Sequence, residues 1–228
     1  MKAIFLDFYG TLVHEDDAII PLICEQIKAG SGCDCDVKDI GTFWWKAFST
    51  KVRDSFGDSF KSQRAIGMGS LEETIRHFRS EAIAEEIIQP QFDHWMRPSI
   101  YDDTFAFLKA FEGVPLYILS NIDTADLESA ICHHNLSVTD WITSEEAKSY
   151  KPRPDMFLEA LGRYHLLPDD VIHIGDSFTN DVRGASPLGI KTVWLNRLDK
   201  RQPEAGSADY VCKDLSSAKQ VLWDEFQW

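Results

Sequence analysis

Two apolar runs of this sequence end on a carboxylate. Asp7 closes the first run and Asp176 closes the run of residues 171–175, with a third acid, Asp181, five residues further on. Short continuous apolar runs are typical of strands buried on both faces of a parallel sheet, and ligands bind at the carboxyl ends of such strands. Carboxylates gathered there repel one another unless a cation joins them. The pattern therefore predicts a metal site at one edge of a sheet.

Polar side chains that could hold an anion stand near these acids. Ser120 and Asn121 end the apolar run of residues 114–121, and Lys151 precedes a proline-rich helix start. A few hard oxygen ligands suit Mg²⁺, which would screen an anionic substrate and orient one aspartate oxygen as a nucleophile. The hydroxyl, the amide, the lysine and backbone N–H groups of the first turn would then stabilise the developing anion. We expect a small anionic metabolite as the substrate.

Strand and helix patterns alternate over most of the chain. The runs that predict strands cover residues 2–8, 114–121, 171–177 and 190–196, with weaker candidates at 140–143 and 209–212. Helical patterns cover about 102–112, 124–134, 154–165, 180–188 and 215–226. Such alternation is typical of right-handed βαβ units, so we expect an α/β fold with a Rossmann-like, doubly wound parallel sheet. His173 lies inside one of these buried strands and is interpreted as a core histidine.

One segment breaks the alternation. Residues 14–97 show only helical periodicity, and about 80 helical residues are too many for a simple crossover. They predict a separate helical subdomain inserted after the first strand. The core would then comprise residues 1–13 and 98–228.

The composition narrows the class of protein. Apolar residues make up 44% of the 228 residues, enough for a packed core, and the net charge of -14 argues against nucleic acid as a partner. The five cysteines fit no zinc pattern, which indicates free thiols in a reducing compartment. The apolar run at the N-terminus is too short for a signal peptide or a membrane span. We expect a cytoplasmic protein without a membrane partner, and the sequence does not indicate an oligomeric state.

Four short stretches, in this order, carry a resemblance to a known family. "DFYGTL", "LSN", "KPRPDMF" and "GDSFTNDVRGA" resemble motifs I to IV of the haloacid dehalogenase-like (HAD) hydrolases. The resemblance covers nearly the whole chain, and the helical insertion is similar to the cap of the subfamily that carries one after motif I. It implies a hydrolase whose cap closes over a site at the strand ends.

The resemblance also implies a role for individual residues. Asp7 would be the nucleophile that forms an aspartyl intermediate, and Asp7, Asp176 and the backbone carbonyl of Tyr9 would bind Mg²⁺. Asp181 would act at the metal through a bound water or by holding Lys151, which would neutralise Asp7 and the anion. Lys148 is a rival for this role, but the family lysine commonly precedes proline, as Lys151 does. Ser120, with Asn121 beside it, would bind the transferred group. Substrate binding in the first turn would involve Tyr9, Gly10 and Thr11.

Tyr9 departs from the phosphatase pattern. HAD phosphatases usually carry an aspartate at this position, which protonates the leaving alkoxide, whereas the 2-haloacid dehalogenases read D-x-Y-G-T-L. Dehalogenases also hold their substrate with an arginine of the cap. The stretch of this chain nearest to that arginine in context is "FWWKAF", which offers Lys46 as the substrate ligand. Arg53 and Arg64 could take the place of the dehalogenase arginine, but at different spacings from motif I.

Motif IV points the other way. The dehalogenases need no metal, yet "GDSFTND" keeps both acids, Asp176 and Asp181, as Mg²⁺-dependent phosphatases do. We therefore expect a Mg²⁺-dependent phosphatase of a small phosphorylated metabolite, slowed by the missing acid. The alternatives are a 2-haloacid dehalogenase and a catalytically idle relative that only binds a ligand.

Overall fold

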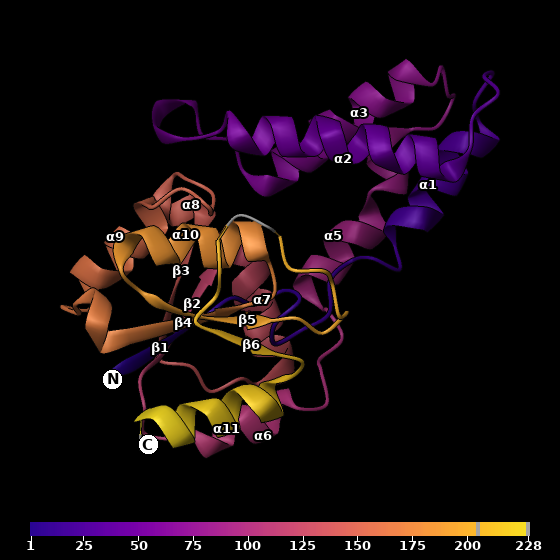
Figure 1. Cartoon of the computed structure of the whole chain (residues 1–228). Coiled ribbons are helices and arrows are strands. Elements are labelled where there is room, and N and C mark those ends of the chain that lie inside the picture. Colours follow the sequence, from indigo (N-terminus) through magenta and orange to yellow (C-terminus); the bar gives the residue numbers. More distant parts are fainter. Residues whose placement is uncertain (204–205, 227–228) are drawn as a thin grey trace.

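A sheet of six parallel strands forms the centre of the molecule (Figure 1). The computed structural model describes residues 1–203 and 206–226. The strands are β1 (Ala3–Leu6), β2 (Leu116–Ser120), β3 (Asp140–Thr143), β4 (Val171–Gly175), β5 (Lys191–Leu195) and β6 (Tyr210–Cys212). Their spatial order is β3-β2-β1-β4-β5-β6, which confirms the doubly wound, Rossmann-like prediction. The order reverses between β1 and β4, where folds of this class leave a crevice for a ligand.

Alternate residues of β1 face two different helical layers. Ile4 and Leu6 share a core with α6 (Thr104–Ala110), α7 (Thr124–His134) and α11 (Leu215–Phe226). Ala3 and Phe5 pack on the other side against α9 (Asp155–Arg163) and α10 (Arg183–Ala185). Figure 1 shows the second layer above the sheet and α6 with α11 below it. Because both faces are covered, the strands read as continuous apolar runs rather than alternating ones.

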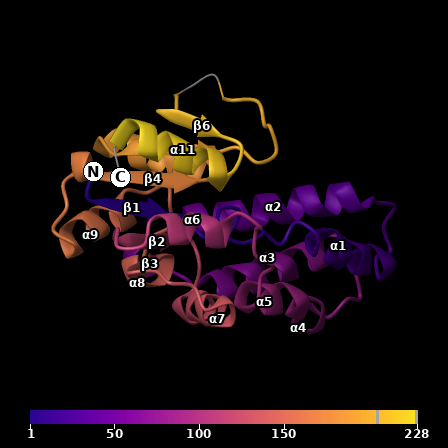
Figure 2. The ribbon, with the colours of Figure 1, turned by 90° about the horizontal axis from the view of Figure 1, so that it is seen from below.

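Residues 14–97, called the inserted segment from here on, contain helices only. They are α1 (Ile20–Ala29), α2 (Val37–Arg53), the 3₁₀ turn η1 (Gly57–Ser59), α3 (Gln63–His77), α4 (Ala84–Ile87) and α5 (Gln89–Met96). Asp36 begins α2 with a capping box and Ser62 caps α3. The chain leaves the core at Val13 and returns at Ile100, and these two residues pair as an antiparallel bridge. In Figure 2 the inserted helices lie beside the sheet, on the side toward which the strands point.

The remaining elements are short. They are α8 (Ser144–Ala147), the 3₁₀ turns η2 (Pro168–Asp170) and η4 (Ser186–Leu188), and the π-helical turn η3 (Phe178–Val182). Across the described ranges 1–203 and 206–226, no helix has both the length and the apolar character that crossing a bilayer requires.

The prediction of one helix over residues 180–188 was wrong in its details. The chain instead forms η3, then α10, then η4. The Ser177 hydroxyl accepts the N–H of Asn180, and the Ser177 carbonyl accepts those of both Asp181 and Val182. This widened turn points Asp181 inward, and Pro187 lacks the N–H that would continue a regular helix.

Candidate active site

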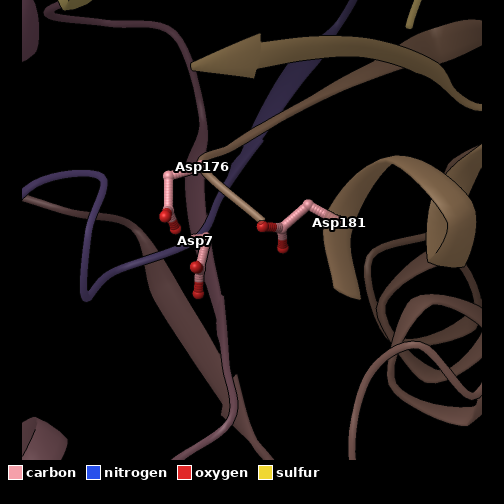
Figure 3. A group of neighbouring side chains, drawn as sticks. All are labelled: Asp7, Asp176 and Asp181. Atoms are coloured by element: carbon pink, nitrogen blue, oxygen red, sulfur yellow. The ribbon is translucent and has the colours of Figure 1, made fainter. Parts of the chain in front are cut away.

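Three carboxylates meet at the switch point of the sheet. Asp7 follows β1 and donates its backbone N–H to the Ile174 carbonyl of β4 at 2.9 Å, while Asp176 directly follows β4. Asp181 comes from η3, and one oxygen of each carboxylate lies within 4.8 Å of the others. Figure 3 shows the three side chains gathered where β1 and β4 end. The strand ends thus bring together the three acids that the sequence singles out.

Lys151 is buried among these acids. Its Nζ lies 2.9 Å from Asp7 Oδ1 and 2.6 Å from Asp181 Oδ1. The Lys151 side chain is only 1% exposed, so its charge is screened little by water. Lys148 has a different environment, with its Nζ over the ring of Phe60. The geometry thus brings Lys151, and not Lys148, to Asp7.

Asn121 holds the backbone of Lys151. Its side-chain Nδ2 donates to the Lys151 carbonyl at 2.9 Å, and its Oδ1 accepts the Lys151 N–H at 2.7 Å. These two hydrogen bonds fix residues 148–153, called the lysine segment from here on, against the end of β2. Ser120 is buried beside Asn121 as the last residue of β2, two residues beyond Ile118, the register partner of Leu6. Asn121 therefore contacts Lys151 directly, in addition to standing near the strand end where the anion is expected.

Burial and mutual repulsion raise the pKa values of two of the three acids. Loss of solvation and the charge of Asp181 raise the pKa of Asp7 to about 6, although Lys151 opposes the rise. Loss of solvation and the charges of Asp7 and Asp181 raise the pKa of Asp176 to about 8. For Asp181 burial also favours the neutral form, but Lys151 and His173 outweigh it and hold the pKa below the usual range. A divalent cation between Asp7 and Asp176 would favour the ionised form of both.

The oxygen donors present fit Mg²⁺. Asp7 and Asp176 offer carboxylate oxygens, and the backbone turn after β1 runs directly against Asp176. A Cβ added to Gly10 would lie 2.5 Å from the Asp176 carboxyl, and Gly10 has a φ of +78°, so both space and conformation require glycine there. Gly10 thus packs directly against the Asp176 carboxyl, and the Tyr9 carbonyl as a metal ligand stays a prediction. Both oxygens of Asp181 already accept hydrogen bonds from the protein, which favours its alternative role of holding Lys151.

The Tyr9 hydroxyl is bound to the inserted segment. Its hydroxyl donates to the backbone carbonyl of Trp95 in α5. Burial and the charges of Asp126, Glu15 and Asp16 raise the pKa of Tyr9 well above its usual value. A phenol held in this way ties the first turn to the inserted segment and is poorly placed to protonate a leaving group.

The other residue predicted in the first turn, Thr11, is fully buried. Its carbonyl accepts from the Arg197 guanidinium at 2.9 Å, and its Oγ1 has no hydrogen-bond partner among the described residues. The backbone of Thr11 thus helps to hold the turn after β1. Its role in binding a substrate stays a prediction.

The structure does not bring Lys46 to the carboxylates. Lys46 is exposed on α2 and lines a hollow formed by residues of α2 and α3. The positive charges that act on the pKa values of Asp7 and Asp176 are those of Lys151 and Lys200. Lys46 as a substrate ligand stays a prediction. Of the two substitutes, Arg53 is exposed beside Asp54, whereas Arg64 binds the core.

Contacts between the inserted segment and the core reach the loops that carry the site. Asp123 accepts the backbone N–H groups of Gln63 and Arg64 at 2.6 and 3.0 Å. The Arg64 guanidinium forms a two-bond ion pair with the buried Asp126 of α7. A second set of contacts joins residues 56–61 to the lysine segment: the Tyr150 hydroxyl donates to the Lys61 carbonyl, Gly57 N–H donates to the Lys148 carbonyl, and Arg153 covers the ring of Phe56.

Sequence reasoning missed two residues at the site. His173 was interpreted as an ordinary core residue, but its Nε2 lies 3.0 Å from Asp181 Oδ1. The signal was a histidine inside an otherwise apolar run, three residues before Asp176. Glu15, in the linker to the inserted segment, is a fourth acid near the cluster. The charge of Glu15 interacts with those of Asp176 and Asp7, and its side chain is exposed.

Comparisons with known proteins identify the family. A family model described as haloacid dehalogenase-like hydrolase matches residues 1–189. The chain belongs to this family. It is therefore a hydrolase, as the four motifs predicted.

Its relatives include enzymes of more than one kind. The bifunctional riboflavin kinase/FMN phosphatase of Arabidopsis thaliana is 34% identical, over 97% of this chain and 55% of that protein. The phosphoserine phosphatase of Thermus thermophilus is 32% identical, over 58% of this chain and 55% of that protein. This HAD chain thus spans about half the length of these two relatives. The L-2-haloacid dehalogenase structure from Xanthobacter autotrophicus superposes with a TM-score of 0.78 at 16% identity, covering 99% of both chains, which shows a shared fold.

Proposed function

We propose that this HAD hydrolase is a Mg²⁺-dependent phosphatase of a small phosphorylated metabolite, acting through an aspartyl-phosphate on Asp7. The observation that carries the proposal is the second strand-end carboxylate, Asp176, which lies with Asp7 and Asp181 so that one oxygen of each is within 4.8 Å of the others. The phosphatase relatives support the reaction class. A metal held by Asp7, Asp176 and the Tyr9 carbonyl would neutralise the phosphate and orient it toward the nucleophile.

The chain's own residues account for the remaining requirements. The Asp7 oxygen not bound to Lys151 attacks phosphorus, and the ester oxygen leaves with the electrons of the broken P–O bond. Lys151 neutralises charge on Asp7 and on the transferred group, and Asn121 keeps the lysine in place. Ser120 lies at the adjacent strand end, within the region where the phosphoryl oxygens are expected. Water then hydrolyses the aspartyl-phosphate and restores Asp7.

We also propose that the inserted segment acts as a cap. Its contacts with residues 123–126 and 148–153, close in sequence to Asn121 and Lys151, support this role. Closure of such a segment excludes water and selects the substrate. The domain division at residues 13/14 and 97/98 is part of this proposal.

The leaving group should be a good one. No aspartate stands two residues after Asp7, and the Tyr9 hydroxyl is bound to Trp95. General acid catalysis contributes about 10²- to 10⁴-fold, so its absence slows the hydrolysis of alkyl phosphates more than that of aryl phosphates. The protein should therefore act best on activated phosphate esters or anhydrides.

The dehalogenase alternative rests on Tyr9 and on the shared fold. A dehalogenase substrate carries a carboxylate, which Asp176 and Asp181 would repel. The charge that pairs with Asp7 is the ammonium of Lys151. The phosphatase is therefore the better-supported hypothesis for the function of this site.

Hydrolysis of p-nitrophenyl phosphate, with and without Mg²⁺, tests the proposal. Its leaving group needs little protonation, so the missing acid does not hide turnover. We expect Mg²⁺-dependent turnover that Asp7→Asn abolishes and that Asp34→Asn, at an exposed acid of the inserted segment, leaves unchanged. Halide release from an L-2-haloacid without phosphate turnover would establish the dehalogenase instead. Mg²⁺ binding without either activity would establish the idle relative.

A further inference from the structure

A buried imidazole lies directly behind the site. His173 stands in the middle of β4, paired in register with Phe5 of β1 and Thr192 of β5, and is 0% exposed. Its Nε2 lies 3.0 Å from Asp181 Oδ1, and the ring of Phe157 packs edge-on at 5.0 Å between centroids. Burying an imidazole in a strand of this kind is costly unless the ring makes a useful hydrogen bond.

The proton on Nε2 can be assigned from its partner. Asp181 Oδ1 also accepts from the Lys151 ammonium at 2.6 Å, and a buried cation at this distance favours the ionised carboxylate. An ionised carboxylate only accepts, so His173 must donate Nε2–H. The ring is fully buried, so this hydrogen bond to Asp181 is formed away from water.

The Asp181 carboxylate is therefore held by three donors. Oδ1 takes Lys151 Nζ and His173 Nε2, and Oδ2 takes the backbone N–H of Ser177 at 2.9 Å. Lys151 has its own long side chain and cannot fix the carboxylate alone. The imidazole, packed inside a strand, is the rigid side-chain donor of the set.

We propose that His173 is a positioning residue, which orients Asp181 through its Nε2–H and thereby aims Lys151 at Asp7. This inference rests on the proposed function, because it gives Lys151 the role of neutralising Asp7 and the transferred phosphate. Without the His173 donor, Asp181 Oδ1 keeps only Lys151 as a partner, so the carboxylate can shift and draw Lys151 away from Asp7. The effect belongs in the chemical step, since His173 does not contact the substrate region.

A matched pair of substitutions separates positioning from packing. In His173→Gln the amide nitrogen can still donate to Asp181, whereas His173→Met has a similar length and no donor. Turnover of p-nitrophenyl phosphate at saturating Mg²⁺ gives kcat and KM for each. We expect His173→Met to lower kcat by about 10- to 100-fold at nearly constant KM, and His173→Gln to recover most of the loss. Equal kcat values in the two variants would overturn the proposal.

A readout that needs no activity accompanies the kinetics. His173→Met and Lys151→Met are combined in a double-mutant cycle on the unfolding equilibrium constant, measured in urea. Because both side chains bind Asp181 Oδ1, we expect their effects to be non-additive by about threefold or more. Additive effects would show that His173 is only a packing residue. A wild-type protein without phosphatase activity but with this coupling would refute the proposed function while leaving the link from His173 to Lys151 established.

Discussion

Replacing Lys151 by methionine should destabilise the protein strongly. The side chain is 1% exposed and its ammonium lies between Asp7 Oδ1 at 2.9 Å and Asp181 Oδ1 at 2.6 Å. Methionine fills most of the volume but leaves two buried carboxylates without a counter-charge. Breaking a buried ion pair from one side costs about 3–5 kcal/mol, a large share of the roughly 5–15 kcal/mol that stabilises a typical domain.

The loss should depend on pH with a definite sign. In the wild type the folded-state pKa of Asp181 is below its unfolded value, so its contribution is present above about pH 4 and is lost as the pH falls through the folded-state pKa. In Lys151→Met the same burial acts without the lysine, and the folded-state pKa values of Asp7 and Asp181 rise. The variant therefore loses stability as the pH rises above about 4. The difference between the two proteins should grow from pH 5 to pH 7.5.

Urea unfolding at these two pH values, without Mg²⁺, measures the effect. Lys38→Met, at an exposed lysine of α2, is the matched control and should change the free energy of unfolding little. A loss below about 1 kcal/mol for Lys151→Met, or a loss that does not vary with pH, would refute the reasoning that this lysine is the counter-charge of the buried acids.

Three further predictions follow from the same geometry. Mg²⁺ at about 100 times its Kd should raise the free energy of unfolding by about 2.7 kcal/mol, and Asp176→Asn should remove this effect in a thermal melt with added metal. Tyr9→Phe leaves the Trp95 carbonyl without its donor and should lower the free energy of unfolding in urea by about 1 kcal/mol. The ratio of alkyl to aryl phosphate turnover should stay constant in this variant. A fall in that ratio would mean that the Tyr9 phenol is the missing acid. Arg64→Met leaves the buried Asp126 unpaired, and should cost about 1–3 kcal/mol and speed limited proteolysis within residues 54–62.

The sequence predicts the parts of this protein that depend on local pattern. Helices over 124–134 and 215–226, and the strand over 140–143, appear with the predicted bounds, because caps and apolar periodicity are local signals. The strand predicted over 209–212 also ends at Cys212, whereas β1, β2, β4 and β5 end earlier than predicted. Their final polar residues, such as Asp7, leave the sheet to form the site.

The contacts inside the site are less predictable. Asn121 bonds the backbone of Lys151 across 30 residues of sequence, and no local pattern shows which side of the amide will meet it. The same holds for His173, whose strand position gives its burial but not its partner. The π-helical turn that delivers Asp181 depends on Ser177, and helix propensity alone does not show it.

The pairing of Val13 with Ile100 bears on how such a protein could be recombined. The backbone enters and leaves the inserted segment through neighbouring points, with His14 N–H bonded to the Ser99 carbonyl and Tyr101 N–H to the Leu12 carbonyl. A segment with paired ends can be exchanged for another of different length without disturbing the strand order of the sheet. A protein with such a replacement would keep the sheet and the three carboxylates. The new segment would have to supply partners for Asp123 and Tyr150 before the lysine segment was held as it is here.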